Sequence, residues 1–165
     1  MKEKIKHYIK EIILFIIIMI IASNAISLYK SSSLNKEKLS LTNVTLIDNT
    51  PYNFSSTKPT LVHIWAIWCP TCKLEASNIQ YISKHFNVLT IAYKSGTDKD
   101  LKEWLKTNNY DFNVVNDESG FISSHFNIQA FPTTFIYNKN KELVFSDVGY
   151  TSTISLYLKM LWSDI

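Results

Sequence analysis

The clearest structural signal is the stretch Thr60-Leu-Val-His-Ile-Trp-Ala-Ile-Trp-Cys-Pro-Thr-Cys72. It begins as an apolar run broken only by His63, and such a run is typical of a strand buried on both faces. Pro70 suits the first turn of a helix, because the N–H that proline lacks has no partner there. The stretch therefore predicts a buried strand that leads into a helix, with Cys69 and Cys72 at the helix N-terminus.

Strands and helices alternate through the rest of the chain. Residues 44–54 predict a small β-hairpin before the buried strand. After it we expect a strand at 88–93, a helix capped by Thr97, a strand at 112–115, a helix at 118–126, and a hairpin with strands at 133–137 and 143–145. The last helix follows Gly149 and carries Ile154, Leu158, Leu161 and Trp162 on one side. Crossover helices imply parallel strands and the late hairpin implies antiparallel ones, so we predict an α/β fold with a central mixed β-sheet flanked by helices.

The composition fits one folded domain behind an N-terminal address segment. Of 165 residues, 46% are hydrophobic and 13% aromatic, which is enough to bury a core and excludes a disordered chain. All 17 basic residues are lysines, and the first thirty residues hold five of them but only two of the 14 acidic residues. The remaining charges balance, which argues against a nucleic-acid-binding domain. Two cysteines cannot fill a four-cysteine zinc site, so we expect no metal.

The N-terminus has the pattern of a membrane anchor. Residues 1–11 are basic, whereas residues 12–29 carry no charge and include the unbroken apolar run Ile12–Ala22. As a helix, residues 12–29 would extend about 27 Å, close to the bilayer core of about 30 Å. The positive-inside rule places residues 1–11 in the cytoplasm, so we predict a single-pass protein of the inner (cytoplasmic) membrane. A cleaved signal peptide with its site at Ser23-Asn24-Ala25 is the alternative.

Two further regions follow the predicted anchor. Residues 30–41 are polar and aperiodic, which predicts a tether. Residues 42–165 then form the folded domain on the periplasmic, or extracytoplasmic, side of the membrane. This location puts Cys69 and Cys72 in a compartment where disulfides persist.

The spacing of Cys69 and Cys72 points to redox chemistry. Three residues apart on a helix, both sulfurs lie on one face within bonding reach. Cys69 meets the unpaired N–H groups and the positive end of the helix dipole, which favour its thiolate and make it the attacking sulfur. Cys72 lies one turn inside the helix and would resolve the mixed disulfide. A structural disulfide is the alternative, but closing so short a loop would stabilise the fold only weakly.

Two motifs resemble those of a known superfamily. The run Trp65–Cys72 resembles the active-site signature of thioredoxin-fold proteins, and Phe131-Pro132-Thr133 resembles their proline loop. The cysteine motif, continued to Glu75, resembles that of the exported TlpA and cytochrome-c-maturation reductants. Residues 93–98, 114–117 and 149–152 are most similar to the membrane-anchored suppressor-of-copper-sensitivity D (ScsD) proteins. The resemblance covers about residues 42–163 and implies a thioredoxin-like fold and a protein-disulfide oxidoreductase that needs no cofactor.

The resemblance also implies partners and a direction. Exported protein thiols and disulfides would be the substrates, and a membrane thiol donor of the DsbD or CcdA type would supply electrons. We expect a monomer, since the added dimerisation domain of disulfide isomerases is not apparent. Pro70 and Thr71 supply no positive charge to the thiolate, whereas a strong oxidase of the DsbA type carries a histidine between its cysteines. We therefore expect a reductant.

In the proline loop, the resemblance implies a cis peptide bond at Pro132, which would face the cysteine pair. Such a turn would expose the Phe131 backbone for strand-like pairing with a substrate peptide. A trans proline at the first residue of a strand is the alternative. Trp68 is expected to be part-exposed and, with Pro70 and Thr71, to shape the substrate surface.

Two titratable residues are candidates for tuning the cysteines. His63 stands six positions before Cys69, where thioredoxins usually carry an acidic residue. It could relay a proton to or from Cys72 and would then titrate between about pH 5 and 8. The alternative is a core histidine bonded to a backbone carbonyl. Glu75 could be a tuning group of the TlpA type or a charge on the helix surface.

Copper binding is the main rival function. Sco-type copper chaperones use a thioredoxin fold with two cysteines and a histidine as soft ligands, and His125 is the third ligand that this chain could offer. Their cysteines are spaced C-x-x-x-C, whereas Cys69 and Cys72 are spaced C-x-x-C. Peroxiredoxins share the fold but do not rely on a C-x-x-C motif at this junction. The sequence therefore favours disulfide exchange.

Overall fold

The predicted strand and helix at residues 60–72 are both present in the computed structural model, which describes residues 2–32, 34–41, 44–55 and 57–164. They are β3 (Thr60–Trp65) and α2 (Pro70–Ser83), and both begin at the predicted residue. β3 is the central strand of a five-stranded sheet of order β5-β4-β3-β6-β7. All six residues of β3 are buried, as expected of a strand that is covered on both faces.

The sheet is mixed, which confirms the predicted fold class. β4 (Asn87–Tyr93) runs parallel to β3, and β5 (Val114–Asp117) runs parallel to β4. β6 (Thr133–Tyr137) pairs antiparallel with β3, and β7 (Leu143–Val148) pairs antiparallel with β6. The C-terminal end of β3, where the cysteine motif begins, therefore lies in the middle of the sheet.

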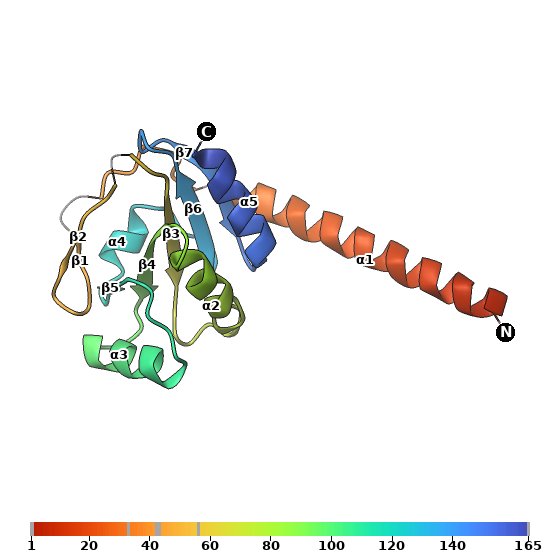
Figure 1. Ribbon diagram of the computed structural model, residues 1–165, viewed down its shortest axis with the longest axis horizontal. Helices are drawn as coiled ribbons and strands as arrows, with labels where there is room; N and C mark the ends of the chain where they lie inside the picture. Colours follow the sequence, from red (N-terminus) through yellow and green to blue (C-terminus); the bar gives the residue numbers. More distant parts are fainter. Residues whose placement is uncertain (1, 33, 42–43, 56, 165) are drawn as a thin grey trace.

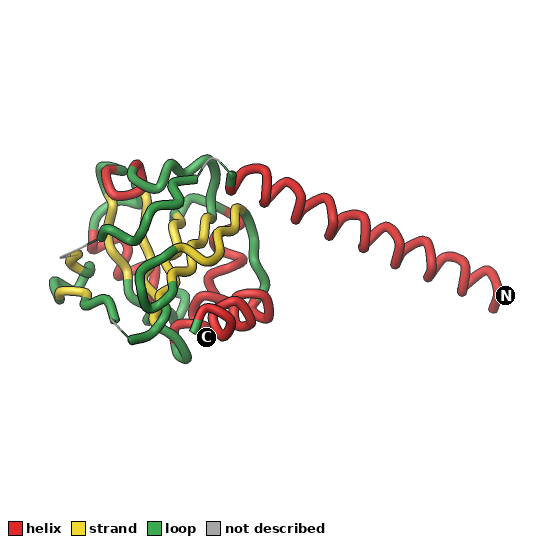
Figure 2. Tube along the Cα trace, turned by 90° about the horizontal axis from the view of Figure 1, so that it is seen from above, coloured by secondary structure: helices red, strands yellow, loops and turns green. Residues whose placement is uncertain are grey.

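Helices cover both faces of this sheet (Figures 1 and 2). α2, α3 (Asp98–Thr107) and α5 (Thr153–Ser163) pack on one face, and α4 (Phe121–Ser124) packs on the other. Thr97 caps α3 as predicted, because its side chain and that of Asp100 exchange hydrogen bonds with the backbone. The predicted hairpin, β1 (Val44–Thr45) and β2 (Pro51–Tyr52), forms a separate two-stranded sheet.

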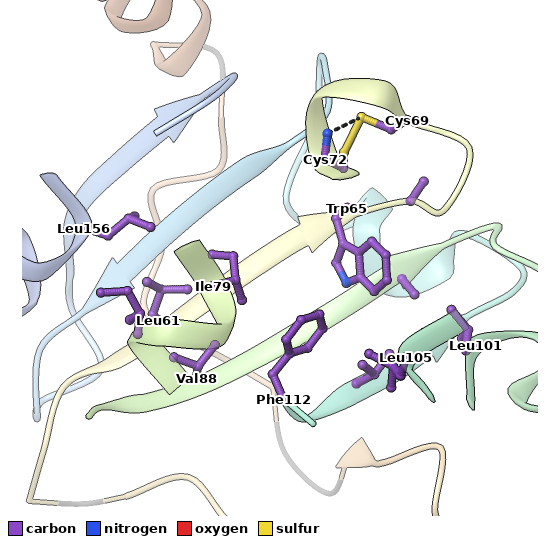
Figure 3. Packing of buried hydrophobic residues seen from close by; sticks show 14 of the residues in the cluster. Leu61, Trp65, Cys69, Cys72, Ile79, Val88, Leu101, Leu105, Phe112 and Leu156 are labelled. Atoms are coloured by element: carbon purple, nitrogen blue, oxygen red, sulfur yellow. Dashed lines mark hydrogen bonds between the residues drawn. A yellow bond between two sulfur atoms is a disulfide. The ribbon is translucent and has the colours of Figure 1, made fainter. Parts of the chain in front are cut away.

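The core under the cysteine motif is aromatic. The Trp65 side chain is 2% exposed, and its ring centre lies 4.8 Å from that of Trp104 and 5.9 Å from that of Phe112. Figure 3 shows Trp65 beneath the turn that carries Cys69 and Cys72. Burying a large apolar side chain stabilises a fold by about 1.5–3 kcal/mol, so this cluster holds the turn firmly against the sheet.

Two elements begin later than the sequence predicts. β5 begins at Val114 rather than at Phe112, whose ring packs in the core before strand pairing begins. α4 begins three residues after the predicted start, because the buried Asp117 side chain accepts the N–H groups of Ile122 and Ser123 at 3.0 and 2.7 Å. These two bonds satisfy free donors of the first turn and so fix where the helix starts.

α5 carries apolar residues on two sides, and the side singled out in the sequence faces outward. Its residues Ile154, Leu158, Leu161 and Trp162 are all exposed. Leu156 and Met160 are instead fully buried against the core. Contacts with α2 and β6 determine which side of the helix is covered, and helical periodicity alone does not contain that information.

The N-terminal part of the chain is a long helix followed by a segment that lies on the domain. α1 (Lys2–Ser31) projects from the domain in Figure 1, and its span His7–Ser31 is long and apolar enough to cross a membrane. In the predicted tether, Leu34 and Leu39 are buried in the core beside α4, so this segment packs on the domain. The predicted domain limits at residues 42 and 165 lie outside the described residues.

Candidate active site

The cysteine pair lies where β3 leads into α2. Cys69 caps the N-terminus of α2, and Pro70 is the first residue of the helix. A disulfide joins Cys69 to Cys72, with their Cα atoms 5.3 Å apart. The Cys72 N–H donates a hydrogen bond to the Cys69 sulfur at 3.2 Å, drawn as a dashed line in Figure 3. The structure therefore contains the geometry that the C-x-x-C spacing predicts.

The two cysteines are both buried but differ slightly in exposure. Cys69 is 5% exposed and Cys72 is 1% exposed, so Cys69 is the more accessible of the pair. Between them, Pro70 is exposed and Thr71 is half-buried. The Cys72 N–H and the positive end of the α2 dipole would stabilise negative charge on Cys69 once the pair is reduced. The arrangement is suited to attack by Cys69 and resolution by Cys72.

Aromatic side chains surround the pair. Trp68 is 54% exposed, and its indole N–H donates to the Lys94 carbonyl at 3.1 Å. Its ring meets that of Phe131 edge-on at 5.5 Å, and the Phe131 ring stacks on Tyr93 at 5.0 Å. The bond between Phe131 and Pro132 is cis, as the resemblance implies. Trp68 and the proline loop, more than sixty residues apart in sequence, thus form one surface.

His63 lies in a buried layer beneath the cysteine motif. It is 2% exposed, and its Nδ1 shares a 2.9 Å hydrogen bond with the Thr134 hydroxyl rather than with a backbone carbonyl. Burial lowers the pKa of His63 to about 3. The expectation that His63 titrates between pH 5 and 8 is therefore wrong, because a charged imidazole would have no solvent in this layer.

Glu75 is also buried, three residues after Cys72 on α2. It has no exposed surface, so it is not a charge on the helix surface. One carboxyl oxygen accepts the Thr151 N–H at 3.1 Å, while the other has no hydrogen-bond partner among the described residues. Burial, with a smaller effect from Asp147, raises the pKa of Glu75 to about 8. Glu75 is therefore protonated near pH 7.

Comparisons with known proteins identify the family of this chain. Residues 34–146 match the AhpC/TSA family. The chain belongs to this family. It is 31% identical over 109 residues to a thioredoxin-like protein of Haemophilus influenzae, and 32% identical over 96 residues to the thiol:disulfide interchange protein DsbE of the same organism. These matches cover 65% and 55% of the chain, and the chain spans 64% and 52% of the two relatives.

Solved structures support a thioredoxin-like fold. StoA from Bacillus subtilis matches with a TM-score of 0.65 at 20% sequence identity, over 74% of the chain and 98% of that structure. The thioredoxin-like fold predicted from the motifs is thereby confirmed. The closer similarity to ScsD proteins stays a prediction.

A polar row that crosses the sheet beneath the site was missed in the sequence. Thr134 on β6 stands opposite His63, and Asp147 on β7 stands opposite Thr134. Asp147 forms an ion pair with Lys159 of α5, with 2.6 Å between nitrogen and oxygen. The signal was the period of two in a strand, which puts Thr134 on the same face as the core residue Ile136. The sequence does not indicate the contacts of Asp147 in the same way, because its partners Thr134 and Lys159 belong to two other elements, β6 and α5.

The structure does not bring His125 to the cysteines. His125 follows α4, where its ring meets that of Phe121 and its Nδ1 bonds to the Phe121 carbonyl. α4 packs on one face of the sheet, whereas Cys69 and Cys72 belong to the core on the other face. Within the described ranges, no group of three His, Cys, Asp or Glu side chains is placed to hold a metal. The copper-site geometry considered from the sequence is therefore contradicted.

Proposed function

We propose that this chain is a protein-disulfide oxidoreductase that reduces disulfides of exported proteins. The observation that carries the proposal is the Cys69–Cys72 pair at the N-terminus of α2, in which Cys69 is the helix cap and the more exposed of the two residues. The similarity to the thiol:disulfide interchange protein DsbE supports the same chemistry. Pro70 and Thr71 add no positive charge between the cysteines, which supports the reducing direction.

The reaction proceeds in two exchanges. The Cys69 thiolate attacks one sulfur of the substrate disulfide, forming a mixed disulfide and releasing the other substrate sulfur as a thiolate that takes up a proton. The Cys72 thiol then loses its proton and attacks the Cys69 sulfur, which releases the second substrate sulfur. Two electrons pass to the substrate, and the Cys69–Cys72 disulfide forms. A dithiol donor must then reduce this disulfide to complete the cycle.

Two buried residues are proposed to tune the second exchange. Glu75 lies one helical turn beyond Cys72, and residues three apart on a helix share a face. Its raised pKa lets it hold a proton near pH 7 and release it near pH 8. His63 stays neutral and holds the layer in place through Thr134. Trp68, Phe131 and Pro132 are proposed as the surface that contacts the substrate.

The long helix α1 is proposed to anchor the protein in the cytoplasmic membrane. Its apolar span supports this, and the lysines before it support a cytoplasmic N-terminus with the folded domain outside. In that position the domain would meet exported substrates and a thiol donor of the DsbD or CcdA type embedded in the same membrane. A monomer suffices for this chemistry, because both cysteines belong to one chain.

Trapping of the mixed disulfide tests the proposal. Replacing Cys72 by serine should let Cys69 form mixed disulfides with exported proteins that are not resolved, visible as thiol-sensitive adducts on non-reducing gels. Replacing Cys69 by serine is the matched control and should give few adducts. The assignment of roles is wrong if the Cys69→Ser chain accumulates the adducts instead.

A further inference from the structure

A groove separates the end of α1 from the loops around the disulfide. Its volume is about 450 Å³, within the range of about 300–1,000 Å³ that is usual for binding pockets. One wall belongs to α1 and includes Asn24 and Ile26. The facing wall includes Thr71 of the cysteine motif, Phe131 of the proline loop, and Tyr150 before α5. We call this the α1 groove.

The α1 wall of the groove is attached to the edge of the sheet. β7 is an edge strand, and it contacts α1. The Val148 N–H donates to the Ser27 hydroxyl at 3.1 Å. Because N–H groups along a sheet edge have no neighbouring strand, this bond gives α1 a defined position beside the site. The α1 residues that line the groove all lie in its last turns, and Figure 2 shows the rest of α1 projecting away from the domain.

The groove has the shape and lining for a stretch of polypeptide. Ile26, Phe131 and Tyr150 offer apolar surface, and Asn24 offers an amide group. Beside Gly149 the groove is open, because a Cβ atom at that position would meet no other atom within 4 Å. Thr71 stands between the two cysteines, so a segment lying in the groove could present its own disulfide to Cys69.

We propose that the last turns of α1 are part of the substrate-binding site and select its protein partners. The occupant is an extended protein segment that carries a disulfide, and it lies between α1 and the proline loop. The α1 residues of the groove belong to the C-terminal end of the predicted membrane span 12–29 and are followed by Lys30, which also lines the groove, so the groove would open at the membrane surface. Partners would therefore be engaged close to the membrane. The inference rests on the proposed disulfide-exchange function and adds a specificity element that lies outside the thioredoxin-like domain.

A bulky residue in the groove tests this inference in the full-length chain reconstituted in lipid nanodiscs. Asn24→Trp would fill the groove, whereas Ala25→Trp, at the next residue of α1, adds the same ring away from the groove lining. Tryptophan is well tolerated at a membrane surface. Each reduced protein is mixed with insulin or with oxidised glutathione, and the rate of a single exchange is followed.

The expected result is a change in selectivity. The ratio of the insulin rate to the glutathione rate should fall at least about fivefold in Asn24→Trp and stay unchanged in Ala25→Trp. A photoreactive benzoylphenylalanine at position 24 should also cross-link to insulin trapped on Cys69 in a Cys72→Ser chain, and at position 25 it should not. This second readout does not depend on the stability of the tryptophan variant.

Other outcomes contradict the inference in distinct ways. An unchanged ratio in Asn24→Trp, or equal losses in both variants, would show that α1 is only an anchor. A mature chain whose mass shows cleavage after Ala25 would also overturn the inference, because the wall would be removed. If the unmodified protein exchanges with neither substrate, the proposed function itself fails.

Discussion

The surroundings of Cys69 favour a charged side chain, whereas the buried layer beneath it, which contains His63 and Glu75, favours neutral ones. At the upper level, free N–H groups and the dipole of α2 favour a negative sulfur at Cys69. In the layer beneath, burial lowers the pKa of His63 to about 3 and raises that of Glu75 to about 8. Near pH 7 the lower layer therefore holds a neutral imidazole and a protonated carboxyl group.

Different groups therefore stabilise the Cys69 thiolate and hold the exchangeable proton. Charge on the Cys69 sulfur is stabilised by backbone groups, which do not titrate. Protons are held in the lower layer by Glu75, which lies on the helix that Cys69 caps and that carries Cys72. Changes in the lower layer should therefore alter how the protein responds to pH and leave the identity of the attacking sulfur unchanged.

The largest effect on the pH dependence of stability is expected from Glu75→Gln. The pKa of Glu75 is raised on folding, so the stability it contributes is present below about pH 4.5 and is lost as pH rises towards about 8. Between these limits the wild type should lose up to about 1.4 kcal/mol of unfolding free energy per pH unit from this group, and Glu75→Gln should not. Urea unfolding at pH 5 and 7.5 measures the difference.

Glu103→Gln provides the matched control for that experiment. Glu103 is an exposed residue of α3, so its replacement should leave the slope between pH 5 and 7.5 as it is in the wild type. If Glu75→Gln and Glu103→Gln show the same slope, the Glu75 carboxyl is ionised in the folded protein, and the proposed contrast between Glu75 and Cys69 fails.

A second effect, confined to acid, is expected from His63→Asn. The pKa of His63 is lowered on folding, so its contribution to stability is present above about pH 6.5 and is lost as pH falls towards about 3. The asparagine variant should show a shallower acid slope, by up to about 1.4 kcal/mol per pH unit, in unfolding measured at pH 6.5 and 4.5. Near pH 7.5 the change in slope should be negligible.

The exposed His85 supplies the comparison for His63. His85→Asn should unfold with the acid slope of the wild type, because its ring lies on the surface. An acid slope in His63→Asn equal to that of His85→Asn would mean that His63 is solvated or charged in the folded state. The contrast between the two levels of the site would then be lost.

The sequence predicted the upper level of the site better than the lower one. The Cys69–Cys72 geometry depends on one local junction between β3 and α2, which the apolar run and Pro70 both indicate. The burial of Glu75 depends on Thr151, 76 residues away, whose N–H bonds to its carboxyl group. No local pattern reports such a contact.

In the fold, too, features that local sequence determines were predicted, and features that depend on distant contacts were not. β3 and β6 have the predicted limits, because continuous apolar runs bounded by turns define them. The outward side of α5 is not apparent from the sequence, since it has two apolar sides and the contacts with α2 and β6 bury one of them. The burial of Leu34 and Leu39 within a polar segment likewise depends on a distant part of the chain around α4.

The reduction potential of the Cys69–Cys72 pair tests the central claim most directly. The full-length protein is equilibrated with glutathione redox buffers, and the oxidised fraction is read by thiol alkylation and mass. A reducing pair, whose thiolate is stabilised by backbone groups alone, should give a potential of about −200 mV or below. A value near about −120 mV, as for a strong oxidant, would contradict the reductant assignment.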